Sequence, residues 1–168
     1  MIPIIISIIS ILLDGILTNY LPYLGNDLSW FTPLFTLVSI FIIYPFYRKK
    51  EKKYYLTVFI IGIIYDLFYT NLLFFNAILF LIIAMISKYI NKNYGLSYLK
   101  LIIYTIILVT VYESLTGLII VLFQLVPITF YKLFYKISHS ILINIIYVEI
   151  LFLILNLIPK KFKKISIN

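Results

Sequence analysis

Cysteine is absent from this sequence of 168 residues, and histidine and charged residues are scarce. The lack of cysteine excludes disulfides, thiolate metal sites and cysteine nucleophiles. The single histidine, His139, leaves no histidine cluster that could hold a metal. Charged residues make up 12% of the chain, far below the roughly 25% that is usual in a soluble domain. They are too few to cover a surface that faces water.

Hydrophobic residues dominate instead, at 64% of the chain, and the mean hydropathy is +1.11. This composition indicates an integral membrane protein. The net charge of +8 would suggest a nucleic-acid partner in a soluble protein. Here the basic residues lie in short blocks between apolar segments, where they set the topology and meet anionic lipid headgroups. The predicted partner of these residues is therefore the lipid bilayer and not nucleic acid.

Polar clusters divide the chain into six apolar segments. The stretch 54–90 is too long for one span of about 20 residues, so we divide it at Thr70 and Asn71, just after Asp66. We interpret Pro127 and the stretch 131–136 as a connection at the membrane interface. The predicted spans are approximately 4–20, 30–47, 54–70, 72–90, 99–123 and 137–158, in a single membrane domain over 1–168 with no internal repeat.

The basic residues predict the orientation of these spans. With the amino terminus inside, twelve Lys and Arg fall on the cytoplasmic side, in the blocks 48–53, 88–100 and 160–164, against Lys132 and Lys136 outside. Such a bias favours six spans. The predicted fold is all-α, a polytopic membrane bundle of six transmembrane helices with both termini cytoplasmic. A five-span alternative would place the last basic block outside.

Acidic residues occur inside these apolar segments, at Asp14, Asp66, Glu113 and Glu149. An Asp near the centre of a membrane helix costs about 2.5 to 3.5 kcal/mol, so each acid needs a partner or a use. At 1.5 Å per residue, Asp14 and Asp66 lie roughly 17 to 18 Å from the cytoplasmic side, and Glu113 and Asn144 about 21 Å. We therefore expect one polar layer in the outer half of the bilayer.

Helical spacing places polar and small residues on one face of three spans. Small residues on such a face allow helices to approach closely, and hydroxyls can donate to a carboxylate. We favour a structural role for these acids, in hydrogen bonds between helices. A proton or substrate pathway, and contact with a partner's transmembrane helix, are the alternatives. The faces comprise Ser7, Ser10, Asp14 and Thr18; Gly62, Asp66 and Tyr69; and Thr110, Glu113 and Gly117.

No catalytic constellation is visible in the sequence. It contains no Ser-x-x-Lys motif, no Gly-rich phosphate loop and no His-Glu spacing typical of a metal site. We therefore expect a protein that is not an enzyme and that has no cofactor and no metal.

The stretch 62–76 reads Gly62-x-x-Tyr65-Asp66-x-x-Tyr69-Thr70-x-Leu72-Leu73-x-x-Asn76. It resembles the signature of the MreD family of bacterial rod shape-determining proteins. Asp14 and Thr18 in the first span, Glu113 in the fifth, Asn144 in the sixth and the basic tail agree with this resemblance. The chain departs from the family at Phe74, where glycine is usual, and at Glu149, which has no family counterpart. The change at Phe74 predicts a different turn geometry between the third and fourth spans.

The resemblance implies a non-enzymatic scaffold of the rod complex, or elongasome, in the bacterial cytoplasmic (inner) membrane. Its direct partner would be MreC, with MreB, RodA and PBP2 in the wider complex, and its role would be to organise lateral peptidoglycan synthesis and cell shape. The candidate residues for structure or partner binding are Asp14, Gly62, Tyr65, Asp66, Thr70, Asn76, Glu113 and Asn144.

The six-span topology is also similar to that of the substrate-binding subunits of energy-coupling-factor vitamin transporters. In this alternative, the protein binds or transports a small molecule in an outward-facing pocket. That pocket would be lined by Asp14, Asp66, Glu113 and Asn144. A role in handling lipid precursors of the cell wall is a third interpretation.

Overall fold

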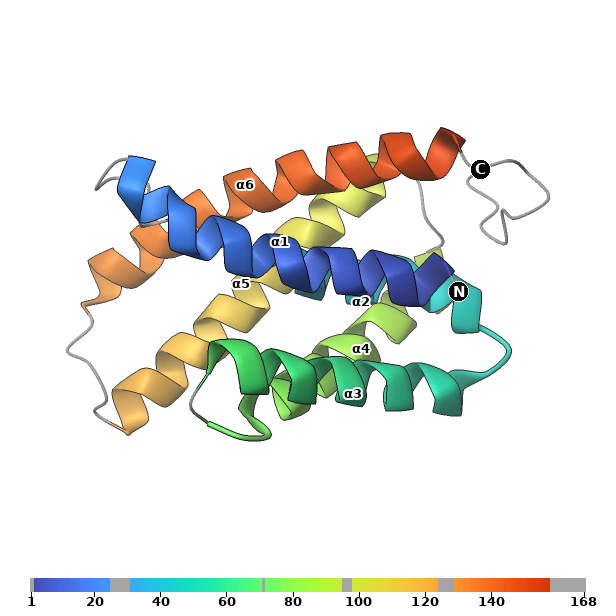
Figure 1. Ribbon diagram of the computed structural model, residues 1–168, viewed down its shortest axis with the longest axis horizontal. Helices are drawn as coiled ribbons and strands as arrows, with labels where there is room; N and C mark the ends of the chain where they lie inside the picture. The colour runs from blue at the N-terminus through green and yellow to red at the C-terminus, as the bar shows by residue number, and fades with distance from the viewer. Residues whose placement is uncertain (1, 25–30, 71, 95–97, 124–128, 158–168) are drawn as a thin grey trace.

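Every regular secondary-structure element in the described part of the chain is a helix. The computed structural model describes residues 2–24, 31–70, 72–94, 98–123 and 129–157. Their helices are α1 (Ile2–Leu24), α2 (Phe35–Tyr47), α3 (Glu51–Tyr69), α4 (Phe75–Tyr94), α5 (Tyr98–Leu122) and α6 (Phe130–Leu157) (Figure 1). The prediction of an all-α bundle of six helices is confirmed.

Consecutive helices run in opposite directions along the bundle (Figure 1). Helix α1 begins and helix α6 ends at the same end, and the turn between α2 and α3 lies there too. This turn carries the start of the basic block 48–53. The two helix ends that lead to the chain termini are therefore on the side of this block, as the six-span prediction requires. That this side is cytoplasmic stays a prediction.

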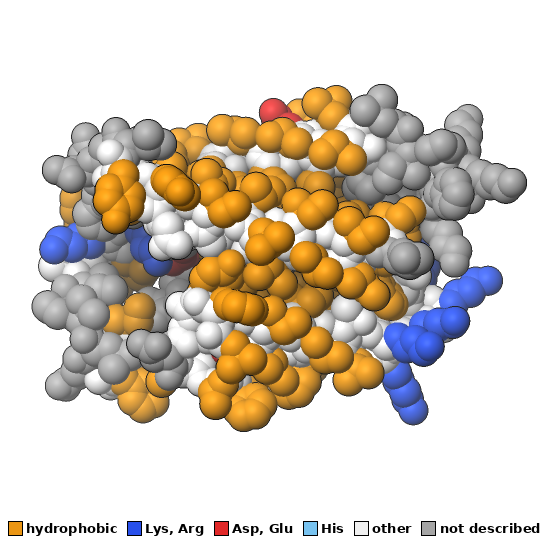
Figure 2. Space-filling view, in the orientation of Figure 1, with side chains coloured by type: hydrophobic (Ala, Val, Ile, Leu, Met, Phe, Trp, Pro, Cys, Tyr) orange, Lys and Arg blue, Asp and Glu red, His pale blue; other side chains and the backbone are white. Residues whose placement is uncertain are grey.

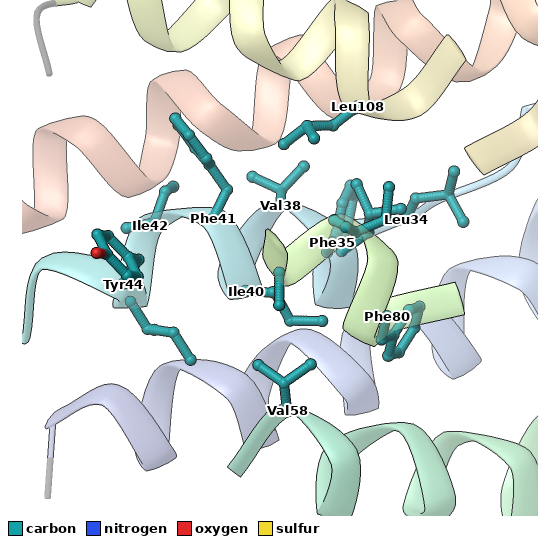
Figure 3. Close-up of a cluster of buried hydrophobic side chains, with 14 of the residues drawn as sticks. Leu34, Phe35, Val38, Ile40, Phe41, Ile42, Tyr44, Val58, Phe80 and Leu108 are labelled. Atoms are coloured by element: carbon teal, nitrogen blue, oxygen red, sulfur yellow. The ribbon is translucent and has the colours of Figure 1, made fainter. Parts of the chain in front are cut away.

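Helix α2 forms the centre of the bundle and contacts each of the other five helices. Ten consecutive residues, 35–44, are buried. A helix that is apolar on every side has to be enclosed on every side. Figure 3 shows Val58 of α3, Phe80 of α4 and Leu108 of α5 around the side chains of this helix. The hydrophobic core is therefore built around α2.

The second helix begins later than predicted. The expected span was 30–47, but residues 31–34 are not helical and the helix starts at Phe35, while residue 30 lies outside the described residues. Pro33 disfavours helical backbone at the residue before it. Side chains of other helices bind the backbone groups that this late start leaves free, as described below.

The sixth helix begins earlier than predicted. Residues 131–136 were expected to form an interfacial connection, but α6 starts at Phe130 and includes them. Thr129 explains this start, because its carbonyl accepts the N–H of Leu133 at 3.1 Å and its hydroxyl lies 3.5 Å from the N–H of Lys132. Pro127 lies outside the described residues. The other four helices agree with their predicted spans to within about one turn.

Three described helices are long and apolar enough to cross a membrane, over Ile2–Tyr23, Tyr98–Leu122 and Phe130–Ile154. Two shorter helices, Phe35–Tyr47 and Phe75–Asn91, are apolar as well. Large apolar side chains cover the face of the bundle in Figure 2, while Lys and Arg lie at its ends. Soluble monomers rarely expose an apolar surface of this extent. The chain is a membrane protein.

Candidate functional site

Asp66, near the end of α3, binds the first turn of α4. Its Oδ1 accepts hydrogen bonds from the backbone N–H and from the side-chain Nδ2 of Asn76, both at 2.9 Å. Its Oδ2 accepts the N–H of Ala77 at 3.1 Å, and the Thr70 hydroxyl donates to Oδ1 at 2.8 Å. The first amide groups of a helix have no partner inside the helix, and negative charge is favoured at this end. Asp66 therefore caps α4 from a neighbouring helix.

The approach of α4 to α3 depends on Gly62, one turn before Asp66. A Cβ atom on Gly62 would meet the backbone of Ala77, whose nitrogen would lie 2.9 Å away. Only a residue without a side chain allows this approach, because the neighbouring atoms are backbone. Gly62 therefore brings the first turn of α4 within reach of the Asp66 carboxylate.

The turn before α4 contains a residue in left-handed conformation, Phe74, with φ of 68°. This region favours glycine and is costly for a residue with a bulky side chain. The Phe74 side chain is half exposed, and its ring stacks on that of Phe59 with centroids 6.3 Å apart. The changed turn geometry expected from this residue stays a prediction. The backbone itself adopts the conformation that glycine would adopt most easily.

Asp14, in α1, binds the start of α2 in a similar way. Its Oδ1 accepts the N–H of Phe35 at 2.7 Å, and its Oδ2 accepts the N–H of Thr36 at 2.9 Å. The carboxylate is 1% exposed. Because α2 starts inside the bundle, water cannot solvate these amide groups, and each would cost free energy if it were left without a partner. The buried acid supplies this partner.

Asn144, in α6, completes the attachment of the segment before α2. Its Oδ1 accepts the N–H of Leu34 at 2.9 Å, and its Nδ2 donates to the carbonyl of Thr32 at 3.1 Å and to that of Ser140 at 2.7 Å. Non-helical backbone at membrane depth is tolerated where protein groups satisfy it or where it lines a cavity. Asp14 of α1 and Asn144 of α6 therefore both hold the start of α2.

The same arrangement of hydrogen bonds occurs in two of the three helical hairpins. In α1–α2 and in α3–α4, an aspartate of the first helix accepts two backbone N–H groups at the start of the second. The spacing along the chain differs, because Asp14 lies 21 residues before Phe35 whereas Asp66 lies 10 before Asn76. The two spacings are therefore not a repeat in the sequence. The recurrence is a property of the fold.

Helix α5 connects to this network through Tyr112, whose hydroxyl donates to Oδ1 of Asn76 at 2.6 Å. The next residue, Glu113, is buried and forms an ion pair with Lys136 of α6, with 2.9 Å between Oε2 and Nζ. The second carboxylate oxygen of Glu113, Oε1, is also buried and has no hydrogen-bond partner in the described part of the chain. Glu113 of α5 therefore also binds the helix that follows it, α6. It does so through the side chain of Lys136 and not through backbone N–H groups.

A recess of about 680 Å³ lies among these groups. Helices α1, α3, α5 and α6 line it, together with the segments that precede α2 and α4. Its charged residues are Asp14, Glu113 and Lys136. Figure 2 shows a hollow with charged side chains at the end of the bundle that lies opposite the start of α1. The recess is therefore a partly open cavity at the predicted outer end, with a few charged groups in a largely apolar wall.

The structure brings most of the predicted residues into two clusters. Gly62, Asp66, Thr70 and Asn76 join α3 to α4, and Asp14 and Asn144 hold the start of α2. The ring of Tyr65 packs edge-to-face on Phe80, with centroids 5.3 Å apart, and Tyr65 lines the recess. Of the four residues expected to line one pocket, Asp14 and Glu113 do so. Asp66 and Asn144 are fully buried outside its lining, which corrects that expectation.

The groups that these side chains bind were not predicted from the sequence. Lys136 was expected in an outer connection, but it lies in α6 and neutralises Glu113. Tyr112 and the amide groups of 34–36 were also missed, because no local pattern marks them. Pro33 was a usable signal for the late start of α2, since proline is common just before or at the first turn of a helix. Within the described residues, no three His, Asp or Glu side chains could share a metal ion.

Comparison with known proteins does not identify this chain. No family model, no curated protein and no solved structure matches it.

Proposed function

We propose that the protein is a non-enzymatic scaffold of the rod complex in the bacterial inner membrane, similar to the MreD family, and that it binds MreC. The observation that carries this proposal is the stretch 62–76, whose signature residues Gly62, Asp66, Thr70 and Asn76 all serve to join α3 to α4. Their hydrogen-bonding groups are used inside the bundle. A signature that maintains a rigid bundle fits a protein that positions partners.

The proposal includes six membrane crossings with the basic end of the bundle in the cytoplasm. The alternating directions of the six helices and the position of the 48–53 block support it. The natural absence of cysteine allows a direct test. A single cysteine at Lys132→Cys should react with a membrane-impermeant maleimide added to intact spheroplasts, while Lys49→Cys should react only after permeabilisation. The reverse pattern would contradict the proposed orientation.

An apolar groove between α1 and α6 supports the proposed binding of a partner helix. It has a volume of about 380 Å³ and is lined along α1 from Ile6 to Leu17. These positions span about 16 Å at 1.5 Å per residue, or about three helical turns. Phe35 and Tyr147 also line the groove, and their rings stack with centroids 4.0 Å apart. We propose that the transmembrane segment of MreC occupies this groove.

Neighbouring isoleucines in α1 provide a matched test of the groove. Ile9 lines it and is 49% exposed, whereas Ile8 is 52% exposed and is not among the lining residues. The substitution Ile9→Trp would fill the groove, and we expect roughly tenfold less MreC to co-purify from detergent. Ile8→Trp places the same side chain on the same helix and should leave co-purification unchanged. Equal effects of the two variants would exclude the groove as the binding site.

Failure of the wild-type protein to co-purify with MreC would count against the scaffold itself. Asp66→Ala is a poor probe of binding, because Asp66 is fully buried and any loss of MreC could follow from a disturbed bundle. The groove variants avoid this ambiguity, since both positions face outward.

A second candidate function is that of a small-molecule binding or transport subunit. The recess of about 680 Å³ favours it, because ligand sites are typically concave, about 300 to 1,000 Å³ in volume and furnished with a few converging polar groups. Equilibrium binding of a small molecule that does not require MreC would support this candidate.

A further inference from the structure

One residue that lines the recess, Glu113, carries a carboxylate oxygen that accepts no hydrogen bond from the described residues. Glu113 lines the recess and is 1% exposed, and its Oε2 pairs with Lys136, whereas its Oε1 is buried and has no hydrogen-bond partner among the described residues. A buried carboxylate oxygen without a donor is costly, and most such groups in folded proteins are satisfied by a partner, a water molecule or a ligand. A donor from outside the chain would remove this cost.

The charged residues of the recess indicate that a ligand donating to Oε1 of Glu113 would be positively charged. Two acids, Asp14 and Glu113, and one lysine line it, so negative charge exceeds positive when both acids are ionised. Asp14 is already satisfied by two backbone N–H groups of α2. Of the two acids, Glu113 is therefore the one with a carboxylate oxygen that can accept a hydrogen bond from a ligand. Lys136 shows that this carboxylate binds an ammonium group at 2.9 Å.

Aromatic side chains make up much of the remaining wall. Tyr65, Tyr69 and Tyr112 line the recess, together with Phe68 and Phe75. Aromatic faces attract organic cations, by about 0.5 to 2 kcal/mol per contact according to exposure. A carboxylate with a free oxygen beside several aromatic rings is a combination suited to an ammonium group attached to an apolar body.

We propose that the recess binds an organic ammonium group, with Oε1 of Glu113 as its acceptor and the tyrosine rings around it. The ammonium could belong to a lipid headgroup such as phosphatidylethanolamine or to a free amine, since both present the same chemistry. This site lies apart from the groove between α1 and α6 and does not depend on binding of MreC. It supplies the ligand class for the second candidate function.

Two matched pairs of probes test the proposal on the full-length protein in nanodiscs of phosphatidylglycerol. Dihexanoyl phosphatidylethanolamine is compared with dihexanoyl phosphatidylglycerol, and tyramine with N-acetyltyramine, each by equilibrium binding. We expect the ammonium member of at least one pair to bind at least roughly tenfold more tightly, which corresponds to one charge-assisted hydrogen bond. The pair that shows this preference distinguishes a lipid from a free amine. Equal binding, or no binding, within both pairs would overturn the proposal.

Variants of the ion pair test the acceptor itself. Glu113→Gln keeps the size of the side chain but removes its charge, so the preference for ammonium should fall to below about threefold. Lys136→Gln removes the ammonium that competes for the same carboxylate, so binding of the cationic probe should strengthen. Glu149→Gln alters an exposed acid outside the recess and should change neither. A preference that survives Glu113→Gln, or weakens in Lys136→Gln, would contradict the assigned site.

Discussion

Removing the Asp66 carboxylate should destabilise the whole bundle, because several buried donors depend on it. In Asp66→Ala, the N–H groups of Asn76 and Ala77 lose their acceptor at the first turn of α4. The Thr70 hydroxyl is less affected, since it already lies 3.3 Å from the carbonyl oxygens of Asp66 and Leu72. The side-chain Nδ2 of Asn76 also loses its acceptor. Three buried N–H donors left without partners cost about 1 to 3 kcal/mol each, so we expect a loss of roughly 3 to 9 kcal/mol.

The conservative variant Asp66→Asn should lie between the wild type and Asp66→Ala. Asparagine keeps one acceptor oxygen but places an NH₂ group where the second oxygen faces an N–H donor. One lost hydrogen bond predicts a cost of about 1 to 3 kcal/mol. As a control, Glu149→Ala removes an exposed acid whose Oε1 accepts from the Tyr98 hydroxyl at 3.1 Å. Surface changes of this kind usually stay within about 0.5 kcal/mol.

Titration with sodium dodecyl sulfate in mixed micelles, followed by near-ultraviolet circular dichroism, would measure these differences in unfolding free energy. Hydrogen exchange adds a local readout, because the amides of Asn76 and Ala77 should lose protection in Asp66→Ala beyond the global change. If Asp66→Ala unfolds at the same detergent fraction as the wild type, the Asp66 carboxylate does not stabilise the start of α4. A loss of stability in Asp66→Ala no larger than that in Glu149→Ala would also contradict the capping role of Asp66.

Three further substitutions test single elements of the same network in the same unfolding assay. Phe74 has a φ of 68°, a conformation that only glycine adopts without strain. We therefore expect Phe74→Gly to be more stable than Phe74→Ala by about 1 kcal/mol. Equal stability would show that the turn is unstrained. Gly62→Ala should lower the free energy of unfolding by about 1 to 3 kcal/mol, because the added methyl group meets the Ala77 backbone and pushes α3 away from α4. No change in stability would mean that the two helices can move apart without cost. Asn144→Ala should cost about 1 to 3 kcal/mol by leaving the N–H of Leu34 without an acceptor, and Asn144→Asp should recover part of this loss.

The start of α2 shows why intramembrane acids are useful to this fold. Helix α2 has 13 residues and a length of about 20 Å, which is shorter than the hydrocarbon core of about 30 Å. Its first amide groups therefore lie inside the protein, where a carboxylate from α1 can bind them. The cost of burying Asp14 is offset by hydrogen bonds that no apolar side chain could make.

Several features were predictable because they depend on neighbours in the chain. The break between α3 and α4 was placed correctly at 70–71, since the stretch 54–90 exceeds the length of one span. Gly62 and Asp66 were correctly assigned to one helical face from their spacing of four residues. The inward position of Asp66 also followed from the sequence, because an acid exposed to lipid is too costly.

Other features required the assembled bundle. Nothing near Asp14 in the chain indicates that its partners are Phe35 and Thr36, because 21 residues and a change of helix separate them. Lys136 could not be paired with Glu113 while the start of α6 was placed too late. A helix boundary that is wrong by two turns moves a lysine from an outer connection into the wall of the recess.

The amino-acid sequence by itself indicated a membrane protein of six helices and an inward position for Asp14, Asp66 and Glu113, because hydrocarbon penalises charge and exposed backbone wherever they occur. The tertiary structure alone decided what those acids do. Asp14 and Asp66 cap the helices that follow them, whereas Glu113 keeps one oxygen free beside a lysine and a recess. These roles depend on which helix ends meet in space, and hydrogen bonds act over distances of about 3 Å that no pattern along the chain can specify.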